Sequence, residues 1–106
     1  AASDVYKRQV VNDTAKIGKN CRIHEGVTIG ATGKNGQAAI IGDNCFLATG
    51  AKVIGDVHLG NDIAVGANAV ITKSFLEDKI TLGGVPAKKI SNHSSRDFLA
   101  DGLFEN

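Results

Sequence analysis

The three histidines of this chain, His24, His58 and His93, are its side chains best suited to proton transfer at neutral pH. An imidazole whose pKa lies near neutrality can act as a general base on a hydroxyl group. His24 stands before Glu25 at an expected corner beside a polar, glycine-bearing stretch, residues 32–37. It is therefore a candidate active-site residue, with a surface or subunit contact as the alternative. His58 is expected to be solvated or subunit-facing, and His93 is assigned no role.

An apolar period of six residues organises the chain and must position these side chains. Counting in sixes from Val11 to Ile71, ten of eleven positions are aliphatic, and only Asn35 breaks the rule. A surface helix repeats near 3.6 residues and a half-buried strand near 2, so a period of six indicates short units stacked along an axis. Three units close a triangular coil of roughly 18 residues, with equivalent sides about 4.8 Å apart. The pattern predicts an all-β fold of stacked parallel coils with the aliphatic residues inside.

The positions around each aliphatic residue support the same architecture. The fourth position after it is small or apolar, and this slot holds Cys21 and Cys45, which we expect to be inert core residues. No His or Cys partner stands at metal-ligand spacing, so we expect no metal. Glycine often follows the aliphatic residue, where a tight corner or a close backbone approach favours a residue without Cβ. These glycines are residues 18, 30, 42, 60 and 66.

The failure of the period at Asn35 predicts a loop. A loop extruded from a corner would leave the coil in register and carry functional residues. The alternative is a poor but ordinary side of the prism over residues 35–40. The two readings differ in one consequence, because looping out six residues stacks Cys21 and Cys45 on one side of the coil. Without the loop they fall on different sides.

The period divides the chain into three segments. Residues 1–9 lack it and are expected to be a non-native or disordered leader, with further native residues upstream. Residues 10–91 are expected to form the β-helix domain. Residues 92–106 are expected to be a capping segment with a short helix, because repeat arrays need their ends covered.

The exit from the coil begins after Ile71, since Glu77 falls where the next aliphatic residue belongs. Ile80 and Leu82 are expected to add a final strand. A turn should follow over residues 83–86, which contain two glycines and the only proline.

Composition places the chain among soluble single-domain proteins. It has 106 residues, of which 42% are hydrophobic, and a net charge of +1. Twelve basic residues without a dense run, together with five aromatic residues, argue against nucleic-acid binding. No apolar run approaches the roughly 20 residues of a membrane span, and no signal peptide is visible. We therefore expect a cytoplasmic protein without membrane partners.

Three stretches resemble the hexapeptide-repeat acyltransferases, and most specifically the serine O-acetyltransferases. They are GVTIGATGK at residues 26–34, the coils at residues 47–73, and GVPAK at residues 84–88, within a match over roughly residues 10–91. The resemblance implies a left-handed parallel β-helix and transfer of acetyl from acetyl-CoA to a small-molecule hydroxyl. It also implies a role in cysteine biosynthesis and a homotrimer with active sites between neighbouring coils.

The family's contacts with acetyl-CoA carry over to seven positions of this chain. Small residues would line the pantetheine arm, and lysines would lie near the phosphates. The positions are Gly33, Lys34, Thr49, Ala67, Thr72, Lys73 and Lys88.

The resemblance also implies direct transfer, in which a His removes the proton of the acceptor hydroxyl. His24 is the candidate catalytic residue and Glu25 the candidate acceptor-binding residue. The chain departs from the serine acetyltransferase pattern, because it lacks the histidine of an Asp-His-Ala-type stretch upstream of the loop and the Asp-Arg-His-Pro stretch after it, and its loop is about two residues shorter. A sugar or polysaccharide hydroxyl is therefore an alternative acceptor, and a catalytically incomplete β-helix module is an alternative to an enzyme.

Overall fold

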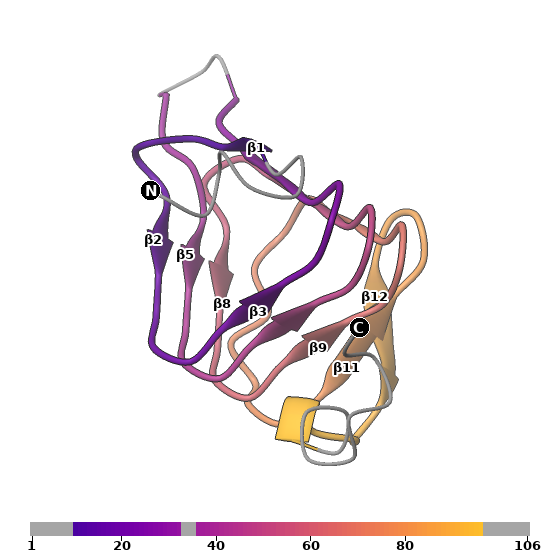
Figure 1. The fold of residues 1–106 in the computed structure, drawn as a ribbon. Coiled ribbons are helices and arrows are strands. Elements are labelled where there is room, and N and C mark those ends of the chain that lie inside the picture. The colour runs from indigo at the N-terminus through magenta and orange to yellow at the C-terminus, as the bar shows by residue number, and fades with distance from the viewer. Residues whose placement is uncertain (1–9, 33–35, 97–106) are drawn as a thin grey trace.

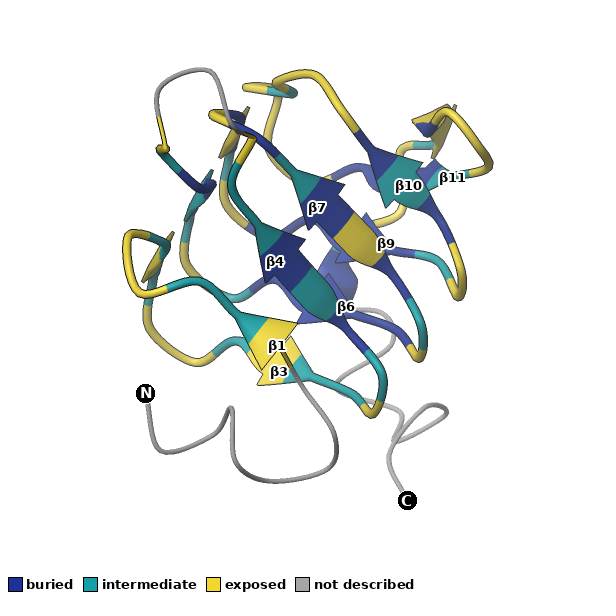
Figure 2. Cartoon of the chain, turned by 90° about the horizontal axis from the view of Figure 1, so that it is seen from above, coloured by how far each residue is buried: buried dark blue, intermediate teal, exposed yellow. Residues whose placement is uncertain are grey.

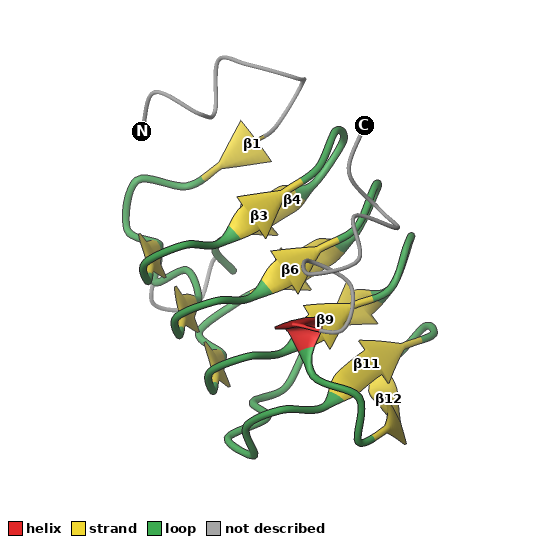
Figure 3. Cartoon of the chain, turned by 60° about the horizontal axis from the view of Figure 1, so that its bottom comes forward, coloured by secondary structure: helices red, strands yellow, loops and turns green. Residues whose placement is uncertain are grey.

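The computed structural model describes residues 10–32 and 36–96 of the chain, and these form a stack of short strands wound into a three-sided prism (Figure 1). Figure 3 shows that loops join the strands at the corners of the prism. The described part contains no helix with the length and apolar character of a membrane span. The strands are β1 (Val10–Val11), β2 (Lys16–Ile17), β3 (Arg22–Ile23), β4 (Thr28–Gly30), β5 (Ile40–Ile41), β6 (Phe46–Leu47), β7 (Lys52–Ile54), β8 (His58–Leu59), β9 (Ala64–Val65), β10 (Val70–Ile71), β11 (Thr81–Gly83) and β12 (Lys88–Ser91).

Three sheets form the sides of the prism. Sheet A has the order β1-β4-β7-β10, sheet B has β2-β5-β8, and sheet C has β12-β11-β9-β6-β3. All pairs are parallel except β11 with β12. This confirms the predicted left-handed parallel β-helix. We call the corners AB, BC and CA after the sheets that they join.

The strand register confirms both the 18-residue coil and the extruded loop. Val11 pairs with Ile29, and Val53 pairs with Ile71, each pair 18 residues apart. Across residues 31–39 the step becomes 24 residues, as in the pairs Ile17–Ile41 and Ile29–Val53. Six additional residues therefore leave the coil at corner AB without disturbing its register.

The aliphatic period fills the interior of the prism (Figure 2). Ile29, Leu47, Val53, Val65 and Ile71 are fully buried. In the first coil the equivalent residues are only partly buried and pack against this core from one end. They are Val11, Ile17 and Ile23.

A ladder of Asx side chains at corner BC explains why glycine follows the aliphatic residue there. The carboxylate of Asp43 accepts a hydrogen bond from Lys19 N–H (2.8 Å), Asn61 Oδ1 accepts one from Asp43 N–H (2.8 Å), and Asp78 Oδ1 accepts one from Asn61 N–H (2.7 Å). A Cβ atom at position 42 would lie 2.7 Å from the carbonyl carbon of Gly60. Only glycine lets each coil approach the next this closely.

The last coil departs from the strict period. Phe75, two positions before Glu77, makes the bridge to Leu59 and packs against the core. The following strand, β11, pairs with β9 and confirms the strand predicted from Ile80 and Leu82, but it is not the final one, because β12 pairs antiparallel with it. The predicted turn leads through a cis peptide bond before Pro86 into β12.

The segment after β12 folds back onto corner BC. Ser95 is fully buried, its N–H donates to Asp62 O (3.0 Å), and its hydroxyl donates to Asn44 O. Arg96 forms an ion pair with the buried Asp62 at 3.0 Å. Ser95 and Arg96 are helical, and the rest of the predicted helix lies outside the described residues, as does the leader at residues 1–9.

Candidate functional site

Four of the sequence-predicted site residues lie along corner CA. Glu25, Thr49 and Ala67 are exposed and belong to three successive coils. The coils stack directly here, because Gly50 N–H donates to Glu25 O and Asn68 N–H donates to Thr49 O, both at 3.0 Å. The structure therefore brings these residues into one column. His24 lies beside Glu25, at the end of the column that belongs to the first coil.

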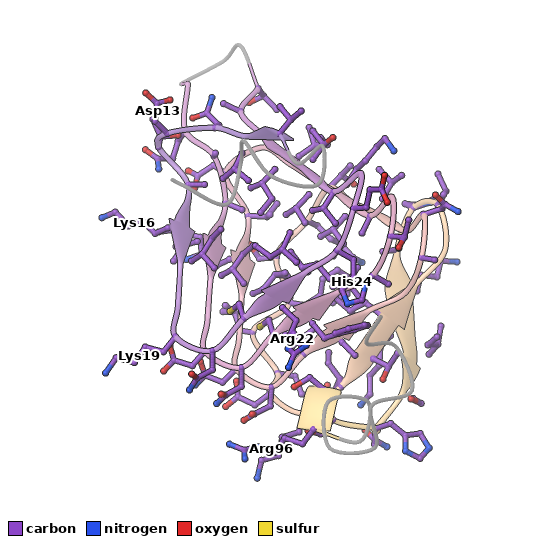
Figure 4. All side chains as sticks on the ribbon, in the orientation of Figure 1. Asp13, Lys16, Lys19, Arg22, His24 and Arg96 are labelled. Atoms are coloured by element: carbon purple, nitrogen blue, oxygen red, sulfur yellow. The ribbon has the colours of Figure 1, made fainter. Side chains whose placement is uncertain are left out.

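His24 leans from this corner over the outer face of sheet C (Figure 4). Its ring meets that of Phe46 edge to face, with centroids 4.9 Å apart and planes at 68°. Phe46 points outward yet is only 3% exposed, in a small cluster with Ala48 and Ala64. The half-buried imidazole of His24 thus has a packed, apolar wall on one side.

Corner AB carries the second group of predicted residues. Thr72 and Lys73 are exposed there, and Lys73 Nζ lies 5.4 Å from the centroid of the Phe75 ring. The extruded loop leaves the same corner two coils earlier, and Gly36 N–H donates to Thr32 O (3.2 Å) across it. The predicted loop residues Gly33 and Lys34 lie outside the described residues.

His24 does not share a corner with the loop. It precedes β4 and the loop follows β4, so the full width of sheet A separates their places on the coil. His58 lies nearer the point where the chain returns from the loop, because it pairs with Ile40. Its Nε2 is 3.7 Å from Asp56 Oδ1, and both side chains are exposed, as expected for a solvated histidine.

Lys88, the last predicted residue, is exposed in β12 beyond corner CA. The turn before it is fixed beside β10, because Val70 N–H donates to Gly84 O (3.0 Å) and Ala87 N–H donates to Val70 O (2.8 Å). This places the start of β12 beside β10, the edge strand of sheet A.

The two groups of predicted residues thus occupy the two corners that border sheet A. Between them, sheet A presents Thr28, Lys52 and Val70 outward, in register across three coils. Lys52 is exposed, and its ammonium group donates to Gly50 O at corner CA (3.1 Å). The sequence analysis did not single out this cation, although its place before the inward Val53 predicts an outward side chain. Within the described ranges, no group of three His, Cys, Asp or Glu side chains could hold a metal ion.

Comparisons with known proteins connect this architecture to a family. Residues 38–73 match the family described as "Bacterial transferase hexapeptide (six repeats)". A serine acetyltransferase of Staphylococcus aureus strain Mu50 is 36% identical over 89 residues, which cover 82% of this chain and 41% of that protein. The chain therefore spans less than half the length of this relative.

Two solved structures show the same fold. The serine acetyltransferase of Brucella abortus strain S19 is 35% identical, with a TM-score of 0.76, over 80% of this chain and 35% of that one. A serine acetyltransferase in complex with CoA is 29% identical, with a TM-score of 0.69, over 77% of this chain and 33% of that one.

Proposed function

The chain belongs to the hexapeptide-repeat family of bacterial transferases, and we propose that it is the β-helical part of an acetyl-CoA-dependent O-acetyltransferase of the serine acetyltransferase type. The observation that carries this proposal is the loop extruded from corner AB of a regular coil, in a chain that resembles serine acetyltransferases over about four fifths of its length.

The coenzyme is proposed to lie against sheet A and to contact residues at both corners that border it, CA and AB. Thr49 and Ala67 offer small side chains at corner CA, where the thin pantetheine arm needs close approach. Lysine ammonium groups are suited to the phosphates of the nucleotide end, as point charges that donate hydrogen bonds to phosphate oxygens. The lysines are Lys34, Lys73 and Lys88, with Thr72 and Gly33 beside them, and Lys52 is a further candidate on the face of sheet A. The CoA complex of one relative supports the choice of ligand.

The proposed reaction is direct transfer. The acceptor hydroxyl oxygen attacks the thioester carbonyl and its proton passes to a histidine. The carbon–sulfur bond then breaks, and the histidine returns the proton to sulfur, so that CoA leaves as the thiol. We propose His24 as that base and Glu25 as a contact to the acceptor. In a single chain His24 stands a full side away from the loop, so this role places the site between neighbouring copies, as in a homotrimer.

Serine is the proposed acceptor because the relatives are serine acetyltransferases. A sugar or polysaccharide hydroxyl is the second candidate, since the loop is shorter than in serine acetyltransferases and lacks their second histidine. A module that binds the coenzyme without turning it over is the third, since the 106 residues of this chain hold no histidine in an Asp-His-Ala-type stretch upstream of the loop.

Calorimetric titration with CoA, followed by thiol release from acetyl-CoA in the presence of serine or of sugars, tests these candidates. We expect saturable CoA binding, and turnover with serine would support the proposed acceptor. Binding without turnover on any acceptor would identify a coenzyme-binding module. The absence of binding by the folded chain would refute the proposal.

Replacing His24 with alanine tests the base. We expect the H24A variant to lose about 100-fold or more in kcat with little change in CoA affinity, as is typical for removal of a general base. The matched control is H58A, which removes an exposed histidine from sheet B and should retain activity. Loss of activity in H58A alone would move the role to His58.

A further inference from the structure

Cys21 and Cys45 occupy neighbouring rungs of one column inside corner BC. Arg22 pairs in register with Phe46, and Arg22 N–H donates to Cys45 O (2.9 Å), so each cysteine directly precedes a paired residue. Neighbouring parallel strands lie about 4.8 Å apart, and a disulfide joins Cα atoms separated by about 4.4 to 6.8 Å. The backbone spacing therefore falls within the range that permits a bond between the two sulfur atoms.

The thiols share the same polar surroundings. Cys21 Sγ–H donates to Gly42 O (3.2 Å), and Cys45 Sγ–H donates to Gly60 O (3.3 Å), in each case a carbonyl of the next coil (sulfur is yellow in Figure 4). Both cysteines are unbonded in this structure. Cys45 is buried, whereas Cys21 is half-buried and lies in the first coil.

The hydrogen bonding makes the two sulfurs chemically unequal. When Cys21 is ionised, the Cys45 thiol can donate to its thiolate in place of Gly60 O, and this lowers the pKa of Cys21 to about 7, against an ordinary value of 9.0. The same interaction, with burial, raises the pKa of Cys45. Cys21 is therefore the attacking thiolate of the pair, and Cys45 is the thiol held in reserve beside it.

We propose that Cys21 and Cys45 are a redox-active dithiol that a low-molecular-weight disulfide converts into an intramolecular bond between the first and second coils. The Cys21 thiolate attacks one sulfur of the small disulfide, forming a mixed disulfide and releasing one thiolate. The Cys45 thiol then loses its proton and attacks Cys21 Sγ, releasing the second thiolate. Two protein thiols are oxidised, and one small disulfide is reduced to two thiols.

The bond would close a ring from residue 21 to residue 45 that contains the whole extruded loop. It would also fasten the partly buried first coil to the fully buried second coil. The proposal does not depend on the acetyltransferase function, because both sulfurs lie at corner BC, away from the corners that border sheet A.

The test is oxidation of the purified, folded chain in buffers of graded oxidised-to-reduced glutathione ratio, with mass spectrometry after acid quenching. We expect the mass of the intact chain to fall by two hydrogen atoms. Proteolysis should then yield one linked peptide pair containing Cys21 and Cys45, which reduction separates. The melting temperature of the oxidised chain should rise. A chain that keeps both thiols at strongly oxidising ratios, or forms only bonds between chains, would refute the proposal.

Two serine variants distinguish the roles of the cysteines and show whether the fold is needed. The C45S variant should stop at a stable glutathione adduct on Cys21, because the second attack is lost. The C21S variant should remain unmodified, because Cys45 is buried. Circular dichroism checks that both variants are folded. Equal adduct formation on both variants while folded would contradict the assigned order of attack and overturn the proposal.

Discussion

The glycines at corner BC have the backbone and an Asx side chain of the next coil where a Cβ atom would project. At Gly42, that atom would lie against Gly60 O and Asn61 Oδ1. Asn61 Oδ1 is itself committed to Asp43 N–H, so it cannot move away without losing a hydrogen bond. The close stacking of the coils at this corner therefore requires a residue without a Cβ atom at position 42.

Replacing Gly42 with alanine should therefore destabilise the fold. We expect a loss of about 1–3 kcal/mol in the free energy of unfolding, the usual cost of overpacking, measured by urea denaturation. The matched control is Gly30→Ala, where the nearest atom to a new Cβ would be Ile54 Cδ1 at 3.7 Å, an ordinary contact. Equal losses of free energy of unfolding in the two variants would show that the clash at position 42 is not the cause of the destabilisation.

The reactivity of Cys21 should follow its lowered pKa. The lowering hydrogen bond comes from Cys45, while burial and the carboxylate of Asp43 act in the opposite direction. Because the pKa is lowered to about 7, the thiolate fraction should rise between pH 6 and 8, roughly two units below an ordinary cysteine.

Initial rates of alkylation by iodoacetamide, read by mass spectrometry at Cys21, measure this profile. We expect a half-maximal rate near pH 7 in the native chain. In a C45A variant the midpoint should move upward, because alanine has no donor to the Cys21 thiolate. A midpoint near 9 in the native chain would contradict the assignment.

Hydrogen bonds to Thr14, in the first coil, hold the returning end of the extruded loop. Thr14 Oγ1 accepts a hydrogen bond from Ala38 N–H (2.8 Å) and donates to Asn12 Oδ1 (2.7 Å), while Gln37 Nε2 donates to Thr14 O (3.2 Å). Ala38 is fully buried, so no water replaces this partner. The returning half of the loop is thus fixed by a residue 24 positions earlier in the chain.

Replacing Thr14 with valine keeps the shape of the side chain and removes the hydroxyl. An unsatisfied buried N–H costs about 1–3 kcal/mol, so exchange of the Ala38 amide hydrogen should accelerate by roughly tenfold or more, read by NMR. The T14S variant keeps the hydroxyl and should exchange like the native chain. An unchanged exchange rate of the Ala38 amide hydrogen in T14V would show that the Thr14 hydroxyl does not hold the loop.

At the scale of elements, the period of six predicted every inward aliphatic residue of the described coils from Val11 to Ile71. It also predicted the loop, because Asn35 is the one position at which the aliphatic period fails. It did not predict Phe75 in the place of Glu77, since the last coil is no longer bound by the 18-residue step. Nor did it predict the attachment of Ser95 to Asn44, a contact between residues 51 apart that leaves no local signal.

The candidate site was predicted less completely than the fold. Its exposed residues were recognised by type, and the coil does stack Glu25, Thr49 and Ala67 in one column. The sequence pattern predicted His24 beside the loop, whereas the two belong to successive corners with β4 between them. The period gives the order of the corners but not the width of sheet A that separates them. It also did not draw attention to Lys52, whose significance comes from its place on that face.

At the scale of the whole molecule, burial changes along the axis of the prism. The inward residues of the first coil are partly exposed, whereas those of the second and third coils have exposed fractions of 0–4%. In a stacked array each repeat is stabilised by the surface that it buries against its neighbours, so inward residues that bury less surface contribute less. Stability should therefore fall from the middle of the stack toward the first coil.

Two isoleucines in one column test this gradient, because Ile17 and Ile41 are paired in sheet B and differ chiefly in their place along the axis. Ile41 is 2% exposed, and Ile41→Ala should cost about 2–5 kcal/mol. Ile17 is only half-buried, so Ile17→Ala should cost clearly less, because less of its surface leaves water on folding. Urea midpoints of the two variants measure the difference. Equal costs would mean that the first coil is as well covered as the second, and that a neighbouring copy or segment completes the stack at that end.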